Sequence, residues 1–232
     1  MARSQTPAAT RSRRGAAAGA GLSRAAITAA AVGIADAEGI DAVTIRRVAE
    51  SLHVSPMALY WHYDGKDALF ESMGDAILDA LALPEPASSW DRDLAAALTA
   101  FSDILRPHPE VARLAAARVL NHPRGLALSD RVLRALEGAE LPDASIAWLG
   151  SMAFNVIMAA VTGELNAPAT AEGALGADAR RMALEAVDER EYPAVARHRA
   201  LLASCDEPDS YFRLVIEHFV GGVRFMATSS AN

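Results

Sequence analysis

The chain has 232 residues, enough for one large domain or two smaller ones, and its 52% hydrophobic content can supply a substantial core. A single cysteine, Cys205, excludes a disulfide framework and a cysteine-based zinc site. The formal net charge of −7 is unevenly placed: residues 1–66 hold eight Lys and Arg against five acids, and residues 67–232 hold fourteen against twenty-four, so only the N-terminal end can attract phosphate.

The first 22 residues, MARSQTPAATRSRRGAAAGAGL, contain four Arg and no acid. They lack the apolar centre of a signal peptide, and we predict a disordered basic arm over residues 1–21. The longest uncharged stretches of the chain are rich in Ala and Gly or broken by Pro and Ser, which predicts no membrane span. A cytoplasmic protein is therefore expected.

Apolar residues recur at helical spacing throughout, and no run alternates between apolar and polar residues as strands do. The first helix is predicted at residues 23–38, with Ser23 as its N-cap and Gly39 followed by Ile40 as a Schellman-type stop. Thr44 is predicted to cap a short second helix.

Ser55 and Pro56 predict the start of a third helix, at residues 56–62, because they supply an N-cap hydroxyl and then a proline in the first turn. The sequence YDGK interrupts this helix before a fourth one predicted at residues 66–83. Two short helices joined by a tight turn, with a longer helix on each side, form a helix-turn-helix arrangement. The sequence PEPASS is typical of a linker and divides the chain into a helix-turn-helix domain at 22–83 and a second domain at 84–232.

Beyond the linker the spacing again predicts only helices, which makes the expected fold all-α. A stretch rich in Gly, Ala and Pro at residues 167–179 is predicted to be flexible. The further helices are expected at residues 90–106, 109–120, 123–137, 143–164, 180–204 (with a break at Pro193) and 208–228.

Four ring residues stand in a row, Tyr60, Trp61, His62 and Tyr63, in a chain with only 6% Phe, Trp and Tyr. A buried helix spaces its aromatic residues three or four apart on one face, so some of these rings must point to water or to a partner. The rings either fill the interface between the first and fourth helices, which suits Tyr63 best because it lies beside the turn, or they contact DNA. A major groove accepts an α-helix, and Tyr hydroxyls and His nitrogens can bond phosphate oxygens.

The run TIRRVAESLHVSPMALYWHYDGKDAL resembles the DNA-binding domain of the TetR family of bacterial transcriptional regulators, over about residues 22–81. The sequence LYWH, followed four residues later by Lys66, is similar to the tetracycline-repressor-like subfamily. The resemblance implies that Arg46 contacts phosphate or guanine and that Thr44 lies near the DNA backbone. The residues that it implies at base edges are Ser55, Pro56, Met57 and Ala58, and those that it implies on the DNA backbone are Tyr60, Trp61, His62 and Lys66.

The sequence departs from the family pattern at two places. His53 stands in the turn where the family usually has Gly, a position at which a residue with a Cβ adopts the left-handed conformation only at some energetic cost. Residues 56–58 are largely apolar, so specificity is expected from thymine methyl contacts, from Arg46 and from DNA shape. In the arm, Arg11, Arg13 and Arg14 either enter the adjacent minor groove or remain a free tail.

The helix predicted at residues 143–164 is apolar nearly all round, and the last helix, at 208–228, is similar. Such helices must be covered on more than one side. They either line a monomer core or, as the resemblance implies, pair with their counterparts from a second subunit in a four-helix interface. Because reading two operator half-sites calls for two-fold symmetry, we expect a homodimer.

An effector pocket for a small apolar or amphipathic molecule is expected in the second domain. His108 and His122, each beside a proline at a helix boundary, either anchor the ligand or serve as surface or capping residues, whereas Asn155 is expected to make a buried hydrogen bond. The expected pocket residues are Trp90, Phe101, His108, His122, Trp148, Met152, Phe154, Asn155 and Met158. No equivalent can be placed for the His through which tetracycline-sensing members of the family bind a drug–metal chelate, so we predict neither tetracycline nor Mg²⁺, and no cofactor or metal.

The sequence contains no phosphate-binding Gly loop, no His, Asp and Glu cluster with metal-ligand spacing and no nucleophile signature, which argues against an enzyme. It therefore predicts a repressor that leaves a partly palindromic operator when an effector binds. An activator, or a helical small-molecule-binding protein that does not use DNA, remains an alternative.

Overall fold

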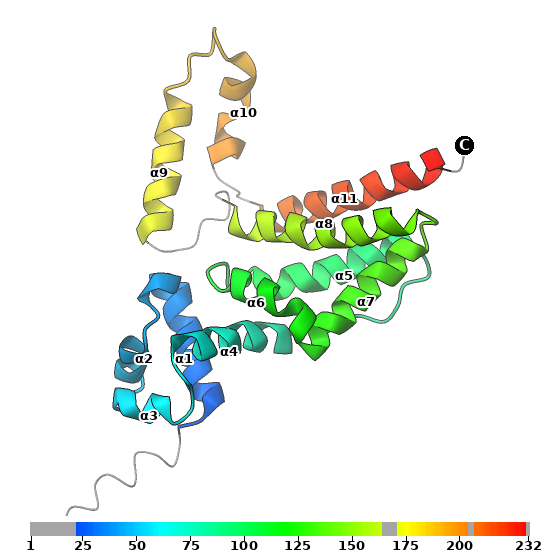
Figure 1. The fold of residues 1–232 in the computed structure, drawn as a ribbon. Coiled ribbons are helices and arrows are strands. Elements are labelled where there is room, and N and C mark those ends of the chain that lie inside the picture. Colours follow the sequence, from blue (N-terminus) through cyan, green and yellow to red (C-terminus); the bar gives the residue numbers. More distant parts are fainter. Residues whose placement is uncertain (1–21, 164–170, 204–206, 231–232) are drawn as a thin grey trace, which may run out of the picture.

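The computed structural model describes residues 22–163, 171–203 and 207–230, and every regular element in these ranges is a helix, as predicted (Figure 1). The N-terminal part, called the head below, consists of α1 (Arg24–Glu38), a 3-10 turn (Ile40–Ala42), α2 (Ile45–Ser51), α3 (Pro56–Tyr60) and α4 (Lys66–Asp79). The head lies at one end of a larger helical body, and α4 extends from the one to the other (Figure 1).

The helix caps in the head follow the sequence. The hydroxyl of Ser23 accepts a hydrogen bond from the N–H of Ala26 at 3.1 Å, and that of Thr44 accepts one from the N–H of Arg47 at 3.0 Å. His53 has a φ of 56°, the left-handed conformation expected where the family usually has Gly. Local sequence signals therefore locate the first two helices and the turn that follows them.

The end of α1 differs from the expected Schellman stop. Gly39 ends the helix with a φ of 87° and a ψ of 160°, which is outside the left-handed helical region. The N–H of Ile40, which would close a Schellman turn, instead donates to a carboxylate oxygen of Glu110 at 3.0 Å. A residue of the second domain thus completes the end of the first helix.

Two further helices of the head are shorter than predicted. α3 ends at Tyr60 rather than at residue 62, because the N–H groups of His62 and Tyr63 both turn back to the carbonyl of Leu59. The hydroxyl of Ser55 makes no capping bond, contrary to expectation. α4 ends at Asp79, four residues before its predicted end.

Tyr63 is 2% exposed and connects three parts of the head. Its hydroxyl lies 2.6 Å from the hydroxyl of Thr28 on α1 and 3.1 Å from that of Ser72 on α4, and it donates to the carbonyl of Arg24 at 3.0 Å. The fourth ring of the aromatic run therefore fills the interface between α1 and α4, the alternative that its place beside the turn favoured. The other rings of the run are not buried.

The body is built around α5 (Trp90–Leu105), which packs against α7 (Pro123–Glu137), α8 (Asp143–Thr162) and α11 (Pro208–Ser230). Phe101 of α5 and Phe154 of α8 meet edge to face, with ring centroids 5.3 Å apart. α6 (Ala112–Arg118) is shorter than predicted, since the residues before it form turns, and the chain continues in a 3-10 turn (Val119–Asn121). α7 has its predicted bounds.

The linker at residues 84–89 contains no helix, as predicted, but side chains of the body hold it in place. The N–H of Ala87 donates to Asp93 at 2.7 Å, and Arg131 donates both to Asp93 at 2.7 Å and to the carbonyl of Pro84 at 3.1 Å. Hydrogen bonding from Arg131 lowers the pKa of Asp93, so the carboxylate is charged at neutral pH. The linker is therefore held against the body by hydrogen bonds at Pro84 and Ala87.

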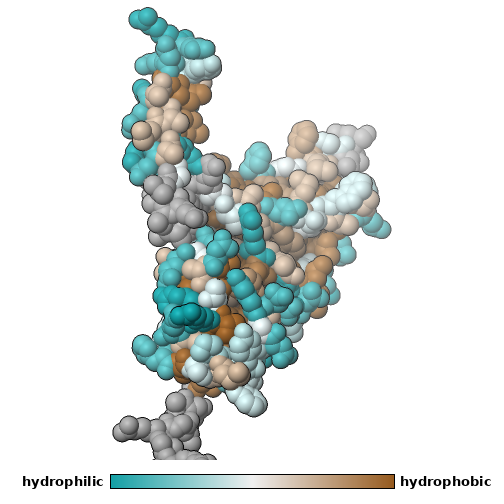
Figure 2. All heavy atoms as spheres, turned by 60° about the vertical axis from the view of Figure 1, so that its left-hand side comes forward, coloured by the Kyte–Doolittle hydropathy of each residue, from teal (hydrophilic) through white to brown (hydrophobic). Residues whose placement is uncertain are grey.

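The segment predicted to be flexible is partly helical. α9 (Ala171–Glu185) covers most of it, while residues 164–170 lie outside the described ranges. α10 (Pro193–Ala203) begins at the proline that was expected to break the helix. The two helices pack on each other and project from the body (Figure 1), and hydrophobic residues lie along one side of the projection (Figure 2).

α8 is long and apolar enough to cross a membrane by length and composition alone, although the sequence predicted no membrane span. Its residues Ala153, Ile157 and Val161 are nevertheless buried within the folded body, where the helix packs against α5, α7 and α11. Its other face carries Trp148 and Met152, which are exposed in the single chain. α8 is thus a core helix with one uncovered apolar face.

The buried hydroxyl of Tyr63 gives a prediction about stability. We expect Tyr63→Phe to lower the free energy of unfolding by about 1 kcal/mol, because it removes hydrogen bonds from a buried group. Tyr60→Phe is the matched control, since the exposed Tyr60 hydroxyl should change stability by less than about 0.5 kcal/mol. Urea unfolding followed by circular dichroism measures both changes, and equal effects of the two substitutions would contradict the assignment.

Candidate functional site

The outer face of α3 is open to solvent along its length. Leu59, fully buried, points into the head, whereas Trp61 is 85% exposed and Met57 67% exposed. Ser55, Pro56 and Tyr60 are also exposed, and Ala58 and His62 are partly so. All the residues predicted to contact DNA from α3 and the turn after it are therefore at least partly accessible to solvent.

α2 supplies two further predicted contacts, and both already have partners within the head. Thr44 is exposed but its hydroxyl caps α2, so its contact with DNA would have to coexist with that bond. Arg46 is exposed and donates to Glu50 at 2.9 Å, one turn along the same helix. Such an exposed pair contributes little stability, which leaves the guanidinium free to exchange Glu50 for a phosphate.

Lys66 begins α4 directly after Gly65, whose φ of 112° is outside the range that other residues adopt readily. Its ammonium lies 4.7 Å from the ring centroid of Phe70, one turn further on. The first turn of α4 combines this cation with the free N–H groups of a helix N-terminus, which favours an anion. The phosphate contact of Lys66 stays a prediction, for which this position at a helix N-terminus is suitable.

Sequence reasoning missed Arg24, at the start of α1. Its guanidinium donates to the carbonyl of His62 at 2.6 Å and lies 4.3 Å from the ring centroid of Tyr63. It thereby holds the chain that leaves α3 against α1. A cation directly after the N-cap Ser23 was the available signal, but its partners lie 38 and 39 residues away and no local rule identifies them.

The residues predicted for the effector pocket do not gather in one chamber. Phe101 and Phe154 pack on each other in the body, and Met158 packs at its edge. Trp90 lies at the start of α5, near Gly138. The remaining members of the α8 set, Trp148, Met152 and Asn155, are exposed in the single chain, so Asn155 does not make the buried hydrogen bond that we expected.

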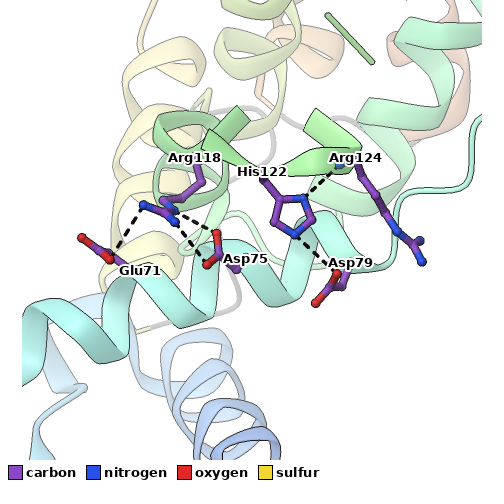
Figure 3. Close-up of polar contacts among 6 residues, drawn as sticks. All are labelled: Glu71, Asp75, Asp79, Arg118, His122 and Arg124. Atoms are coloured by element: carbon purple, nitrogen blue, oxygen red, sulfur yellow. Dashed lines mark hydrogen bonds and ion pairs between the residues drawn. The ribbon is translucent and has the colours of Figure 1, made fainter. Parts of the chain in front are cut away.

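His122 has the capping role that was one of its two expected roles. Its Nδ1 accepts the N–H of Arg124 at 3.3 Å at the start of α7, and its Nε2 lies 3.4 Å from Asp79 at the end of α4 (Figure 3). Beside it, Arg118 donates to Asp75 at 2.8 Å and lies 3.8 Å from Glu71 (Figure 3). Three carboxylates of α4, one per turn, thus face basic groups at the end of α6 and the start of α7.

The backbones of α4 and α6 approach closely beside these ion pairs. A Cβ placed on Gly74 of α4 would lie 2.7 Å from the carbonyl oxygen of Leu114 on α6, too close for any larger residue without movement. Hydrogen bonding to Asp75 raises the pKa of Arg118, so this cation persists at any ordinary pH. The two helices are therefore closely packed and joined by ion pairs.

A second contact between head and body involves the loop between α5 and α6, residues 107–110, called the α5–α6 loop below. The Nδ1 of His108 lies 2.7 Å from a carboxylate oxygen of Asp36 near the end of α1. Glu110 accepts the N–H of Ile40 just beyond that helix. Thus His108 holds the head in place, rather than lying with the other predicted pocket residues.

An outward-facing α3 in a helix-turn-helix head, joined to an all-helical second domain, defines a class of DNA-binding regulators. Residues 27–73 match the family described as "Bacterial regulatory proteins, tetR family", and residues 83–227 match "Tetracyclin repressor-like, C-terminal domain". The chain belongs to the TetR family, in its tetracycline-repressor-like branch.

Similar proteins agree with this assignment. An HTH-type transcriptional regulator of Saccharopolyspora erythraea is 32% identical over 62% of this chain and 61% of its own length. The tetracycline repressor protein class E of Escherichia coli is 33% identical over 36% of this chain and 41% of its own. The chain therefore spans less than two thirds of the length of these curated relatives.

Among solved structures, the TetR family protein ActR of Streptomyces coelicolor in complex with actinorhodin has a TM-score of 0.66. It is 26% identical to this chain, and the match covers 88% of this chain and 96% of ActR. The likeness thus extends over both domains, beyond the part that the curated relatives match.

The exposed face of α3 and the first residue of α4 predict different effects for two kinds of contact with DNA. If Met57 and Ala58 face base edges, as the family resemblance implies, Met57→Ala and Ala58→Ser should change which operator sequences are preferred. Lys66→Ala should weaken binding to every sequence alike and reduce its salt dependence, because a phosphate contact carries no sequence information. Fluorescence anisotropy with a set of operator variants distinguishes base contacts from phosphate contacts. Equal losses of affinity for all sequences from all three substitutions would contradict this assignment of contacts.

The α5–α6 loop gives a separate prediction. Glu110→Ala should weaken operator binding about threefold to tenfold, equivalent to about 0.7–1.4 kcal/mol, because the unbonded N–H of Ile40 loosens the head before it meets DNA. Glu137→Ala is the control, an exposed glutamate at the end of α7. Anisotropy titration measures both, with thermal melts to show that each variant folds. An affinity of Glu110→Ala equal to that of the control would show that the loop does not position the head.

Proposed function

We propose that the protein is a dimeric transcriptional repressor that binds a partly palindromic operator and leaves it when a small molecule binds. The observation that carries the proposal is the α3 surface, where Met57, Tyr60 and Trp61 stay exposed although the head has a well-packed interior. Apolar and aromatic side chains held in solvent on a short helix beside Lys66 suit a major groove and its phosphates.

A second uncovered surface supports pairing of two subunits. α8 and α11 together form an open groove of about 750 Å³ lined almost entirely by apolar side chains, with His218 as its polar member. Trp148, Leu214 and Phe225 on the same two helices are exposed in the single chain. A contiguous apolar surface of this kind is costly in water and is typical of an interface.

Pairing through α8 and α11 would present two heads. A two-fold dimer reads two half-sites one helical turn of DNA apart, about 34 Å, with an α3 in each major groove. Any change in the separation of the heads therefore weakens binding to both half-sites together. The proposal needs only that the effector binds the wrongly spaced conformer more tightly.

The contacts between head and body offer the route for that change. The close approach of α4 and α6 at Gly74, with the ion pair of Arg118 and Asp75, joins the head rigidly to the helices of the body. A ligand that displaces α6 would displace α4 as well. The likeness to ActR, whose structure was solved in complex with actinorhodin, supports a small-molecule effector for this chain too.

The proposal places the protein in the cytoplasm, where operator DNA lies, and assigns it no catalytic step. The alternative function is that of a protein that binds small molecules but not DNA, and the first experiment must distinguish it from a repressor.

Gel-shift titration against the promoter region beside its own gene tests the proposal. We expect a sequence-preferring shift that weakens with salt, since phosphate contacts release counterions. A thermal-shift screen of antibiotics and secondary metabolites, followed by operator release, then identifies the effector. Absence of a sequence-preferring shift would refute the proposed DNA-binding function and favour a protein that only binds small molecules.

The uncovered face of α8 and α11 predicts the oligomeric state. Phe225→Glu should convert the dimer to a monomer and reduce operator affinity at least tenfold, because a buried charge at the interface has no partner. Leu120→Glu is the control, an equally exposed apolar residue that lies on neither helix. Light scattering after size-exclusion chromatography measures the mass, and a monomeric wild type or a dimeric Phe225→Glu variant would refute this interface.

A further inference from the structure

Two adjoining cavities lie where the C-terminal end of α5 meets the N-terminal end of α11. They have volumes of about 550 and 400 Å³ and share three lining residues, Asp103, Arg106 and Phe212. None of the residues predicted for the effector pocket lines either cavity. The crossing of α5 and α11 is thus a separate place for a ligand, which the proposed function does not use.

Arg106 is the central charged group of this crossing. Its guanidinium lies over the ring of Phe212, 4.7 Å from the centroid, and donates to Asp209 at 2.5 Å. The Arg106 side chain is 26% exposed, whereas that of Asp209 is 89% exposed. An ion pair with so exposed a carboxylate contributes little, so a carboxylate from solution can take the place of Asp209.

Two further features favour an anion and an oxygen-bearing ligand here. The first cavity reaches Pro208, the first residue of α11, and the N-terminus of a long helix attracts negative charge. The second cavity is lined by Ser102, which is 1% exposed and whose hydroxyl has no hydrogen-bond partner among the described residues. A buried hydroxyl without a partner is unfavourable, and a ligand oxygen would satisfy it.

The other residues that line the first cavity are mostly apolar, and its one further charged group is Asp103, whose carboxylate lies 3.8 Å from the guanidinium of Arg106. Pro107, Pro109 and Val161 line the first cavity together with Phe212. This combination accepts an aromatic or alicyclic body, while Arg106 binds the acid group. We propose that the crossing of α5 and α11 is a second ligand site, specific for small carboxylic acids with a ring-shaped apolar body, which bind Arg106 in place of Asp209.

The site is connected to the head by the α5–α6 loop. Its residues alternate in role: Pro107 and Pro109 line the first cavity, and His108 and Glu110 hold the end of α1 and the turn after it. A ligand that shifts the prolines would shift the contacts with the head. This regulatory consequence rests on the proposed function, whereas ligand binding itself does not.

Isothermal titration calorimetry on the DNA-free protein tests the site with two probes of the same ring system, similar size and opposite charge, 1-naphthoate and 1-naphthylmethylamine. We expect the acid to bind at least tenfold more tightly than the amine. Arg106→Gln should abolish this preference and Ser102→Ala should weaken acid binding severalfold. Asp209→Asn should strengthen acid binding about threefold or more, because it removes the closer of the two carboxylates that pair with Arg106, the other being Asp103. Arg134→Gln, an exposed arginine of α7, is the control and should change nothing.

Equal affinities for acid and amine, or weaker acid binding by Asp209→Asn, would overturn the site, provided that thermal melts show folded variants. Stronger acid binding by Asp209→Asn cannot arise from misfolding. This variant therefore tests the site even if Arg106→Gln is unstable. Operator titration with and without 1-naphthoate then tests the connection. An unchanged operator affinity would show that the site does not regulate DNA binding, although it binds the acid. If the protein did not bind an operator at all, the proposed function would fail, but the calorimetric test of the ligand site would still be valid.

Discussion

The packing of the inner side of α3 against the interior of the head is the constraint on which the rest of the structure depends. A helix of five residues cannot persist alone, because the cost of fixing its backbone exceeds what so few hydrogen bonds return. Its outer face can therefore stay bare only if its inner side is held firmly. Leu59 and Tyr63 do this by burial, and Arg24 holds the carbonyl that follows the helix. The surface available for DNA is thus a product of the interior of the head.

The same principle extends outward from the head. α4 packs on α1 on one side and on α6 on the other, so the anchored helix-turn-helix unit has one stiff connection to the body. The linker held by Asp93 and Arg131, and the α5–α6 loop with Glu110, restrict the remaining motion. Few independent movements of the head remain, which suits a protein in which a change within the body must alter the spacing of two recognition helices.

How much could be predicted from sequence follows from the range of each interaction. Caps and stops act within one turn, and Ser23, Thr44 and Pro123 correctly mark the start of their helices. The bonds from Glu110 to Ile40 and from His108 to Asp36 join residues about seventy positions apart, and no local pattern encodes them. The start of α9, at residues 171–179, was missed for a different reason, since its Gly- and Ala-rich composition is shared by flexible segments and by packed helices.

The predicted pocket shows the same limit. Large apolar residues on α8 were assigned to a ligand chamber, but a helix with two apolar faces can bury one in its own chain and reserve the other for a second chain, and composition does not tell them apart. The uncovered faces of α8 and α11 have a quantitative consequence. When subunits are scarce relative to their dimer dissociation constant, the dimer concentration rises with the square of the subunit concentration. Occupancy of a two-fold operator would then respond more steeply than linearly to the number of molecules in the cell.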